Sequence, residues 1–188
     1  MRLRRVGATG PTTAAAEERA PYASRVTTLD YATYIAGLPR VLAGAAQLLR
    51  DAEGHVLLVE PNYRNGWALP GGTIESAQGE TPRQAAHRET LEEIGLDVSP
   101  GRLLAVDWVP GTDRPPIVAY VYDGGVLSEE RLKAIRLQEE ELLGWRLVPC
   151  EEITAYLPGG LGHRVLAALD VLTAGAGAVE LENGRVVG

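Results

Sequence analysis

Cysteine and lysine are almost absent from this chain of 188 residues. Because Cys150 is the only cysteine, an intrachain disulfide and a cysteine-based zinc site are both excluded. We expect Cys150 to be a small buried apolar residue, and a reducing cytoplasm suits this cysteine usage. Lys133 is the only lysine among eighteen Lys and Arg residues, a bias typical of a GC-rich bacterial genome.

An excess of positive charge and long apolar runs are also missing. The net charge of −7 offers no basic footprint, so we expect no nucleic-acid partner and no anionic membrane surface as a partner. No stretch approaches eighteen consecutive apolar residues, so no membrane span is predicted. The basic N-terminus is not followed by the apolar segment of a signal peptide. A bound metal would still let an acidic protein hold a phosphate ester.

The composition along the chain predicts one domain with a segment on either side. Residues 1–27 combine small and polar residues without periodicity, which is typical of a poorly ordered arm. Residues 28–174 are expected to form the domain, and residues 175–188 a C-terminal tail. A short helix is predicted over residues 28–38, with Asp30 as its cap.

The order of the apolar segments predicts the fold class. Neither a GxGxxG fingerprint nor a Walker P-loop is present. Strands are predicted at 41–50, 55–60, 67–69, 102–109, 117–122 and 142–148, turns at 51–54 and 123–125, and late helices at 151–157 and 162–174. This order favours an α/β fold, in which a mixed sheet has helices on both faces, over a doubly wound parallel sheet.

A further helix is predicted to begin after Thr81 and to end at Gly95. Thr81 suits the N-cap and Pro82 the first helical position. Gln84 stands where the capping-box partner of Thr81 belongs. Gly95 suits a left-handed C-cap.

The same helix carries a crowd of carboxylates. Residues three and four apart are neighbours on a helix, so Glu89, Glu92 and Glu93 fall on one side, and Leu91 and Ile94 on the opposite side. Clustered carboxylates suit hard divalent cations such as Mg²⁺ or Mn²⁺, whose natural substrate partner is a phosphoanhydride. A solvated acidic helix face is the alternative interpretation.

The segment Arg88-Glu89-Thr90-Leu91-Glu92-Glu93-Ile94-Gly95-Leu96, with Glu80 before it, resembles the Nudix box. The family pattern is Gly, five residues, Glu, seven residues, then Arg-Glu-U-x-Glu-Glu-x-Gly-U, where U is a bulky apolar residue. Seven residues do separate Glu80 from Arg88. The resemblance implies the Nudix fold, an α/β/α sandwich with a mixed β-sheet between helices, over about residues 40–172.

The resemblance also implies roles for the box residues. Glu89, Glu92 and Glu93 would bind Mg²⁺ or Mn²⁺, and Gly72 would offer its backbone carbonyl as a further ligand. Arg88 would hold the carboxylates in place by salt bridges. The general base of the family often comes from the box or from a later loop, and Glu141 is our candidate in that loop. For Glu141 and its two acidic neighbours, a solvated run is the alternative.

One departure from the family pattern lies in the loop before the helix. Seven residues separate Gly72 from Glu80, instead of five, so the loop over residues 75–79 is two residues longer. The register of the helix is untouched. The carbonyl of Gly72 is the group that the longer loop would displace.

The substrate is less readable than the box. The family hydrolyses a nucleoside diphosphate linked to another moiety, so a nucleotide sugar, ADP-ribose or a nucleoside triphosphate is expected. Arg64 and Arg114 are candidates for phosphate contacts, and Pro110 loosely resembles the proline of ADP-ribose pyrophosphatases. Trp67 and Trp108 are candidates for stacking on a base, with a place in the core or its rim as the alternative.

Two other functions stay open at this point. One is hydrolysis of a prenyl or other non-nucleotide diphosphate, and the other is a Nudix fold that binds a ligand without turnover. The partner expected in each case is a small-molecule diphosphate. Dimers are common in the family, so a homodimer is an expectation as well.

Overall fold

The structure is a computed structural model that describes residues 30–187, and the chain divides into two compact units at Pro39. The first unit contributes helix α1 (Tyr31–Ala36), inside the segment predicted to be helical. The arm expected at residues 1–27 lies outside the described residues. Among the residues that the structure describes, no helix is long and apolar enough to cross a membrane.

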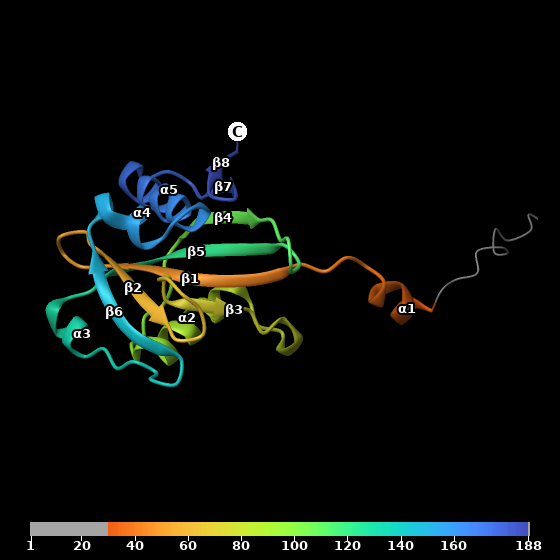
Figure 1. Cartoon of the computed structure of the whole chain (residues 1–188), viewed down its shortest axis with the longest axis horizontal. Helices are drawn as coiled ribbons and strands as arrows, with labels where there is room; N and C mark the ends of the chain where they lie inside the picture. The colour runs from red at the N-terminus through yellow and green to blue at the C-terminus, as the bar shows by residue number, and fades with distance from the viewer. Residues whose placement is uncertain (1–29, 188) are drawn as a thin grey trace, which may run out of the picture. The chain divides into compact units, whose positions relative to one another are not determined.

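The second unit is built on one mixed sheet (Figure 1). The strand order is β6-β2-β1-β5-β4-β7-β8, and β3 pairs with β1 outside this path. The pairs β1–β5 and β4–β7 are parallel, and the other pairs are antiparallel. The strands are β1 (Leu42–Arg50), β2 (Val56–Pro61), β3 (Gly71–Thr73), β4 (Leu103–Val109), β5 (Ile117–Val126), β6 (Leu142–Val148), β7 (Val179–Glu182) and β8 (Arg185–Val186).

Helices cover both faces of this sheet, which confirms the predicted fold class. Figure 1 shows α4 (Ile153–Tyr156) and α5 (Gly160–Ala174) above the sheet and α2 (Pro82–Ile94) below it. The face under α5 is apolar, with Leu48 and Leu58 packed against Val165. The remaining helical segments are η1 (Ser76–Gln78), α3 (Glu129–Lys133) and η2 (Cys150–Glu152).

Two predictions are wrong, one about a turn and one about the burial of Cys150. The turn predicted at 123–125 lies inside β5, because the β1–β5 register shifts between Leu48 and Leu49 and the strand continues to Val126. Such a shift is a β-bulge, and Gly125 takes the left-handed conformation (φ 77°) that it requires. Cys150 is exposed at the start of η2, although a buried position is expected from its residue type.

The segment expected to be a tail belongs to the sheet. Strand β7 runs parallel to β4, and β8 returns antiparallel to β7. Local sequence gives little sign of these strands, because Leu181 is the only residue of either strand that is buried. Pairing with β4, not local periodicity, defines this edge.

The chain between β2 and α2 fills the place where β1 and β2 diverge. Ala68 forms an isolated bridge with Val59 of β2, where a strand over residues 67–69 is predicted. Pro70 then accepts a hydrogen bond from the backbone N–H of Gln47 in β1. The glycine segment expected to be a loop is strand β3, paired with residues 44–46. The two glycines therefore have fixed positions against β1.

Candidate active site

Helix α2 begins and ends where its sequence predicts. The hydroxyl of Thr81 accepts from the N–H of Gln84, and the Gln84 side chain accepts from the N–H of Thr81. Pro82 occupies the first turn, where its missing N–H costs nothing. Gly95 caps the C-terminus in the left-handed conformation (φ 69°). Local hydrogen bonding thus fixes both ends of the helix.

The face that α2 buries differs from the prediction. Its buried residues are Ala85, Ala86, Thr90, Glu93 and Ile94. Leu91 is 44% exposed, whereas the carboxylate-bearing Glu93 is only 5% exposed. The helix is therefore rotated so that one of its carboxylates enters the interior. The cause is polar: strand β3 presents a backbone donor at the place where Glu93 lies.

A buried glutamine on β1 fixes the position of α2. The Nε2 atom of Gln47 donates to the carbonyl of Ala86 (3.1 Å), to Oγ1 of Thr90 (2.9 Å) and to the carbonyl of Val98 (2.9 Å). Thr90 in turn donates to the carbonyl of Ala86. Gln47 is fully buried. One amide thus ties the middle of the helix, and the segment after it, to the central strand.

The β1–β3 ladder points the polar groups of the two glycines in opposite directions. Ile74 and Pro70 hydrogen-bond to β1, at Ala43 and Gln47 respectively. Residues of an antiparallel pair alternate between bonded and non-bonded positions, so Gly72 directs its N–H and C=O at β1 and Gly71 directs both away from it. Consistent with this, the N–H of Gly71 donates to Oε2 of Glu93 at 2.8 Å.

Gly72 makes room for a second carboxylate. A Cβ atom on Gly72 would lie 2.5 Å from Oε1 of Glu89, a distance that real Cβ atoms do not show. The carboxylate of Glu89 therefore packs directly on the backbone of β3. Only glycine permits this approach.

Arg88 holds the acidic groups around it. Its Nε and Nη2 atoms donate to the two carboxylate oxygens of Glu80, at 2.8 and 3.1 Å. Its Nη1 lies 2.9 Å from an oxygen of Glu89 and 2.9 Å from one of Glu92. Nη2 also donates to the carbonyl of Thr73. The bond to Arg88 lowers the pKa of Glu80, and the bond to Glu80 raises the pKa of the guanidinium. This network joins the loop, β3 and α2.

Glu89 and Glu93 carry more negative charge than their surroundings neutralise. The pKa of Glu93 is raised to about 8, mainly by burial and also by the nearby charges of Glu89 and Glu141, while the hydrogen bond from the N–H of Gly71 lowers it. Burial also raises the pKa of Glu89, although Arg88 opposes the shift. A cation placed between the two carboxylates would relieve both effects.

Two residues predicted from outside the helix lie near this pair. The charge of Glu141 acts on both Glu89 and Glu93, and the charge of Arg64 lowers the pKa of Glu93. The loop before β6 is held in place because the carbonyl of Glu93 accepts from the N–H of Gln138, at 3.1 Å, and the carbonyl of Glu141 from the N–H of Asn62. The loops that carry Arg64 and Glu141 are thus joined to each other, and the charges of both residues act on Glu93.

The donor set fits a hard divalent cation. Glu89, Glu92 and Glu93 supply carboxylate oxygens, and the carbonyl of Gly71 is directed away from β1 on the side of Glu93. Within residues 30–187, the group whose three ligand atoms all lie within 4.8 Å of one another is a different one, Asp51 with Glu53 and His55 at the β1–β2 turn, so the box carboxylates are spread more widely than this. There Asp51 accepts from the backbone N–H of His55, so its geometry closes the turn.

Trp67 lies on the other face of the sheet from Glu89. It is partly buried against the α5-side core, and its ring meets that of Tyr156 edge to face at 5.9 Å. The guanidinium of Arg146 lies over both rings, 5.4 Å from Trp67 and 5.0 Å from Tyr156. An aromatic pair with a cation is thus present, as a base-binding wall or as part of the core rim.

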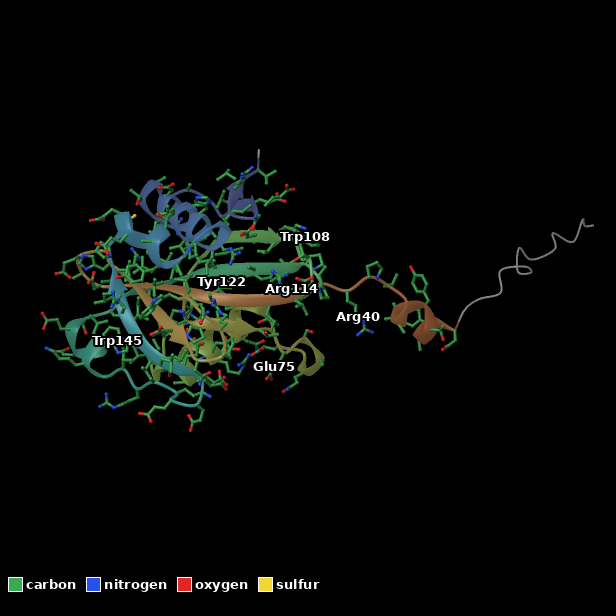
Figure 2. The ribbon with its side chains drawn as sticks, viewed as in Figure 1. Arg40, Glu75, Trp108, Arg114, Tyr122 and Trp145 are labelled. Atoms are coloured by element: carbon green, nitrogen blue, oxygen red, sulfur yellow. The ribbon has the colours of Figure 1, made fainter. Side chains whose placement is uncertain are left out.

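Pro110 and Arg114 lie at the connection between β4 and β5. Figure 2 shows Arg114 and Trp108 at the end of the sheet where β5 begins. Strands β1 and β5 stand between β3 and β4, so β4 is three strand spacings, about 14 Å, from the glycine pair. The structure does not bring Pro110 or Arg114 together with the box carboxylates.

The two extra loop residues form a compact turn at the surface. Residues 76–78 are the 3₁₀ helix η1, closed by Gly79 in the left-handed conformation (φ 78°). Beyond it, the carboxylate of Glu80 accepts from the N–H of Glu75 at 2.8 Å. Residues 75–79 are exposed, and Figure 2 shows Glu75 on this turn. The extra length therefore projects outward and leaves the Glu80–Arg88 pair intact.

Sequence reasoning missed two residues of this site. The prediction assigned the carbonyl ligand to Gly72 and overlooked its neighbour Gly71. The alternation of hydrogen-bonded and non-hydrogen-bonded positions in β3 distinguishes the two. Gln47 is a lone polar residue in an apolar strand, and that exception is itself a signal, because buried polar groups are retained where they have partners.

Comparisons with known proteins agree with this geometry. A family model described as NUDIX domain matches residues 40–169. The RNA pyrophosphohydrolase of Psychrobacter cryohalolentis is 39% identical over 69 residues, which cover 36% of this chain and 39% of that protein. The RNA pyrophosphohydrolase of a Sulfurovum species is 31% identical over 99 residues, which cover 50% of this chain and 59% of that protein. The chain thus spans less than two thirds of the length of these relatives, 39% of the first and 59% of the second.

Solved structures show the same fold. The NUDIX domain of Shewanella oneidensis NrtR, complexed with ADP ribose, superposes with a TM-score of 0.58 at 18% identity, over 77% of this chain and 99% of that one. A C. elegans Ap4A hydrolase superposes with a TM-score of 0.56 at 19% identity, over 72% of this chain and 99% of that one. The likeness concerns architecture.

Proposed function

Because this chain belongs to the Nudix family, we propose that it is a divalent-metal-dependent hydrolase that cleaves a phosphoanhydride bond. The substrate class is a nucleoside diphosphate linked to another moiety. The observation that carries the proposal is a pair of carboxylates, the buried Glu93 and the half-buried Glu89, packed on the two glycines of β3. Both carboxyls have a raised pKa, which a cation would offset.

Glu89, Glu92 and Glu93 are proposed to hold Mg²⁺ or Mn²⁺. The backbone ligand is proposed to be the carbonyl of Gly71, since the carbonyl of Gly72 is directed at β1. When bound, such an ion polarises a phosphoryl oxygen and lowers the pKa of a coordinated water. Arg88 positions the ligands, because it contacts both Glu89 and Glu92.

Glu141 is proposed as the general base. The support for this role is that the charge of Glu141 acts on both Glu89 and Glu93. Arg64, which acts on Glu93 from the loop after β2, is proposed to contact a substrate phosphate. Arg114 stays a candidate for a distal part of a long substrate, whereas Pro110 lines a separate hollow beside the end of β4.

A nucleotide is preferred over a prenyl group because the family hydrolyses nucleoside diphosphates linked to another moiety. Trp67, Tyr156 and Arg146 lie on the other face of the sheet from Glu89, where they pack against the α5-side core, and they carry no part of this preference. Relatives named RNA pyrophosphohydrolase make an RNA bearing a 5′-triphosphate a further substrate to examine. A location in the reducing cytoplasm is proposed from the single cysteine, and a homodimer is proposed because dimers are common in the family.

A phosphate-release screen tests the proposal. Nucleoside triphosphates, nucleotide sugars, ADP-ribose, dinucleoside polyphosphates, 5′-triphosphorylated RNA and prenyl diphosphates would be offered with Mg²⁺ or Mn²⁺. Glu93→Gln and Glu92→Gln should each lower kcat/KM by about a hundredfold or more. Glu139→Gln, an exposed carboxylate of the loop before β6, is the matched control. No turnover of any substrate would sink the enzyme proposal in favour of a binding module, and unchanged rates in both box variants would refute the assignment of catalysis to the box.

A further inference from the structure

A hollow lies between the end of β4 and the β7–β8 hairpin, away from the box. Its volume is about 820 Å³, within the range of small-molecule sites. Trp108, Glu182, Asn183 and Arg185 contribute to its lining. The hollow involves β4, β7 and β8, and β4 is itself about 14 Å from β3 by strand count. A ligand here need not touch the box carboxylates.

The floor of the hollow is rigid. The buried carboxylate of Asp107 accepts from the N–H of Gly184, at 3.0 Å, and from Nε of Arg164 on α5, at 2.7 Å. The N–H of Asn183 donates to the carbonyl of Trp108 at 2.9 Å. Gly184 packs so closely on Gly160 that a Cβ there would lie 2.3 Å from its carbonyl oxygen. Strand β4, the hairpin turn and α5 therefore form one fixed unit.

Sheet register places three functional groups on one face. Trp108 is the register partner of Glu182 in the parallel β4–β7 pair, and Glu182 is that of Arg185 in the β7–β8 hairpin. Side chains of register partners project to the same face of a sheet. Asp107, one residue earlier, points to the opposite face, where it meets Arg164. An indole ring, a carboxylate and a guanidinium thus stand in a row.

These groups have few partners of their own. Trp108 is 43% exposed, and within residues 30–187 its ring makes no aromatic or cation–π contact. In the same described part of the chain, neither Glu182 nor Arg185 forms a side-chain hydrogen bond or ion pair, although the two are opposite each other. Their hydrogen-bonding capacity is available to a ligand.

We propose that this hollow is a binding site for a guanine nucleotide, separate from the hydrolase site. A base stacks on Trp108, as bases do on exposed aromatic rings. Guanine presents ring N–H and amino donors side by side, which one carboxylate, Glu182, accepts, whereas adenine presents a ring acceptor that the carboxylate repels. Arg185, one step along the row, is a donor for O6 on the same edge of the guanine. The site does not depend on the proposed hydrolysis.

Isothermal titration calorimetry in the presence of a metal chelator tests this proposal. The full-length chain would be titrated with GMP and with AMP, so that turnover at the box cannot interfere. We expect saturable GMP binding that is at least tenfold tighter than AMP binding. Trp108→Leu should weaken GMP binding at least tenfold, and Glu182→Gln should remove the preference for GMP over AMP.

Two controls separate this site from its surroundings. Glu180→Gln removes a charge from the same strand outside the hollow and should leave GMP affinity unchanged. Glu93→Gln should leave it unchanged as well, even if the hydrolase proposal fails. Absence of saturable GMP binding, AMP binding of equal strength, or loss of GMP binding in Glu93→Gln would each overturn the proposal. So would a dimer that dissociates in Trp108→Leu while GMP does not bind, since the face would then be a self-association surface.

Discussion

The backbone N–H of Gly71 donates a 2.8 Å hydrogen bond to Oε2 of Glu93, which brings a carboxylate of α2 into the interior against strand β3. This bond accounts for the burial of the Glu93 carboxylate, because a buried carboxylate requires a donor. It also leaves the carbonyl of Gly71 directed away from β1. The orientation of the glycine pair and the position of Glu93 on α2 therefore depend on each other.

Gly72→Ala should impair catalysis more than folding. The new Cβ would fall 2.5 Å from Oε1 of Glu89, so that carboxylate must move by about 1 Å, and a displacement of that size costs about 10²-fold in rate. Steady-state kinetics and chemical denaturation measure the two effects. Gly177→Ala, where a Cβ meets nothing within 4 Å, is the matched control. Equal rates in both variants would contradict the placement of Glu89.

The metal-free protein should lose stability as pH rises from about 4.5 to about 8. The pKa of Glu93 is raised to about 8 in the folded state, from 4.5, so the folded state binds the proton more tightly in this window. The free energy of unfolding then falls with rising pH, by up to about 1.4 kcal/mol per unit for one proton. Urea denaturation with a chelator at pH 5, 6.5 and 8 measures the slope. Glu93→Gln should have a flatter slope, and an identical slope would refute the assignment.

Gln47→Leu should lower the stability of the protein and weaken the attachment of α2 to β1. The carbonyl of Val98 and Oγ1 of Thr90 lose a buried donor, at a cost of about 2 kcal/mol in unfolding free energy. The half-saturating Mg²⁺ concentration of the enzyme should also rise, because α2 carries the proposed ligands. Thr90→Val, which keeps the bonds from Gln47 to Ala86 and Val98, should have a smaller effect on both. A metal requirement that is unchanged in Gln47→Leu would show that the amide serves folding alone.

Removal of Ser76 and Ala77 should be tolerated. The deletion restores five residues between Gly72 and Glu80, and the lost residues belong to the exposed turn η1. Because Glu80 directly precedes the N-cap Thr81, its pair with Arg88 should persist, and kcat/KM should stay within tenfold of the wild type. Glu80→Gln, which weakens that pair in a chain of full length, is the comparison. A hundredfold loss in the deletion variant would instead make η1 part of the substrate site.

Local signals in the sequence were enough for helix α2 and for the fold class. Thr81, Pro82, Gln84 and Gly95 act through contacts within a few residues, so the helix bounds follow from the sequence. The strand order around the helix gave the mixed sheet between helices. The box pattern likewise identified the carboxylates without any coordinates.

The rest depended on pairing between distant segments. Strand β7 forms by pairing with the edge of β4, and β8 then pairs with β7. The turn predicted at 123–125 is instead part of β5, where the register against β1 shifts. Periodicity alone could not resolve these features, since they arise from partners far along the chain.

The amino-acid sequence by itself determined which residues the proposed chemistry rests on, because caps, spacing and residue type are local properties. Only the tertiary structure decided how they are presented. It buried Glu93 and exposed Leu91, turned the carbonyl of Gly71 rather than that of Gly72 away from β1, and held α2 through Gln47. The physical reason is that burial, and the direction of a backbone carbonyl, depend on which strand lies opposite.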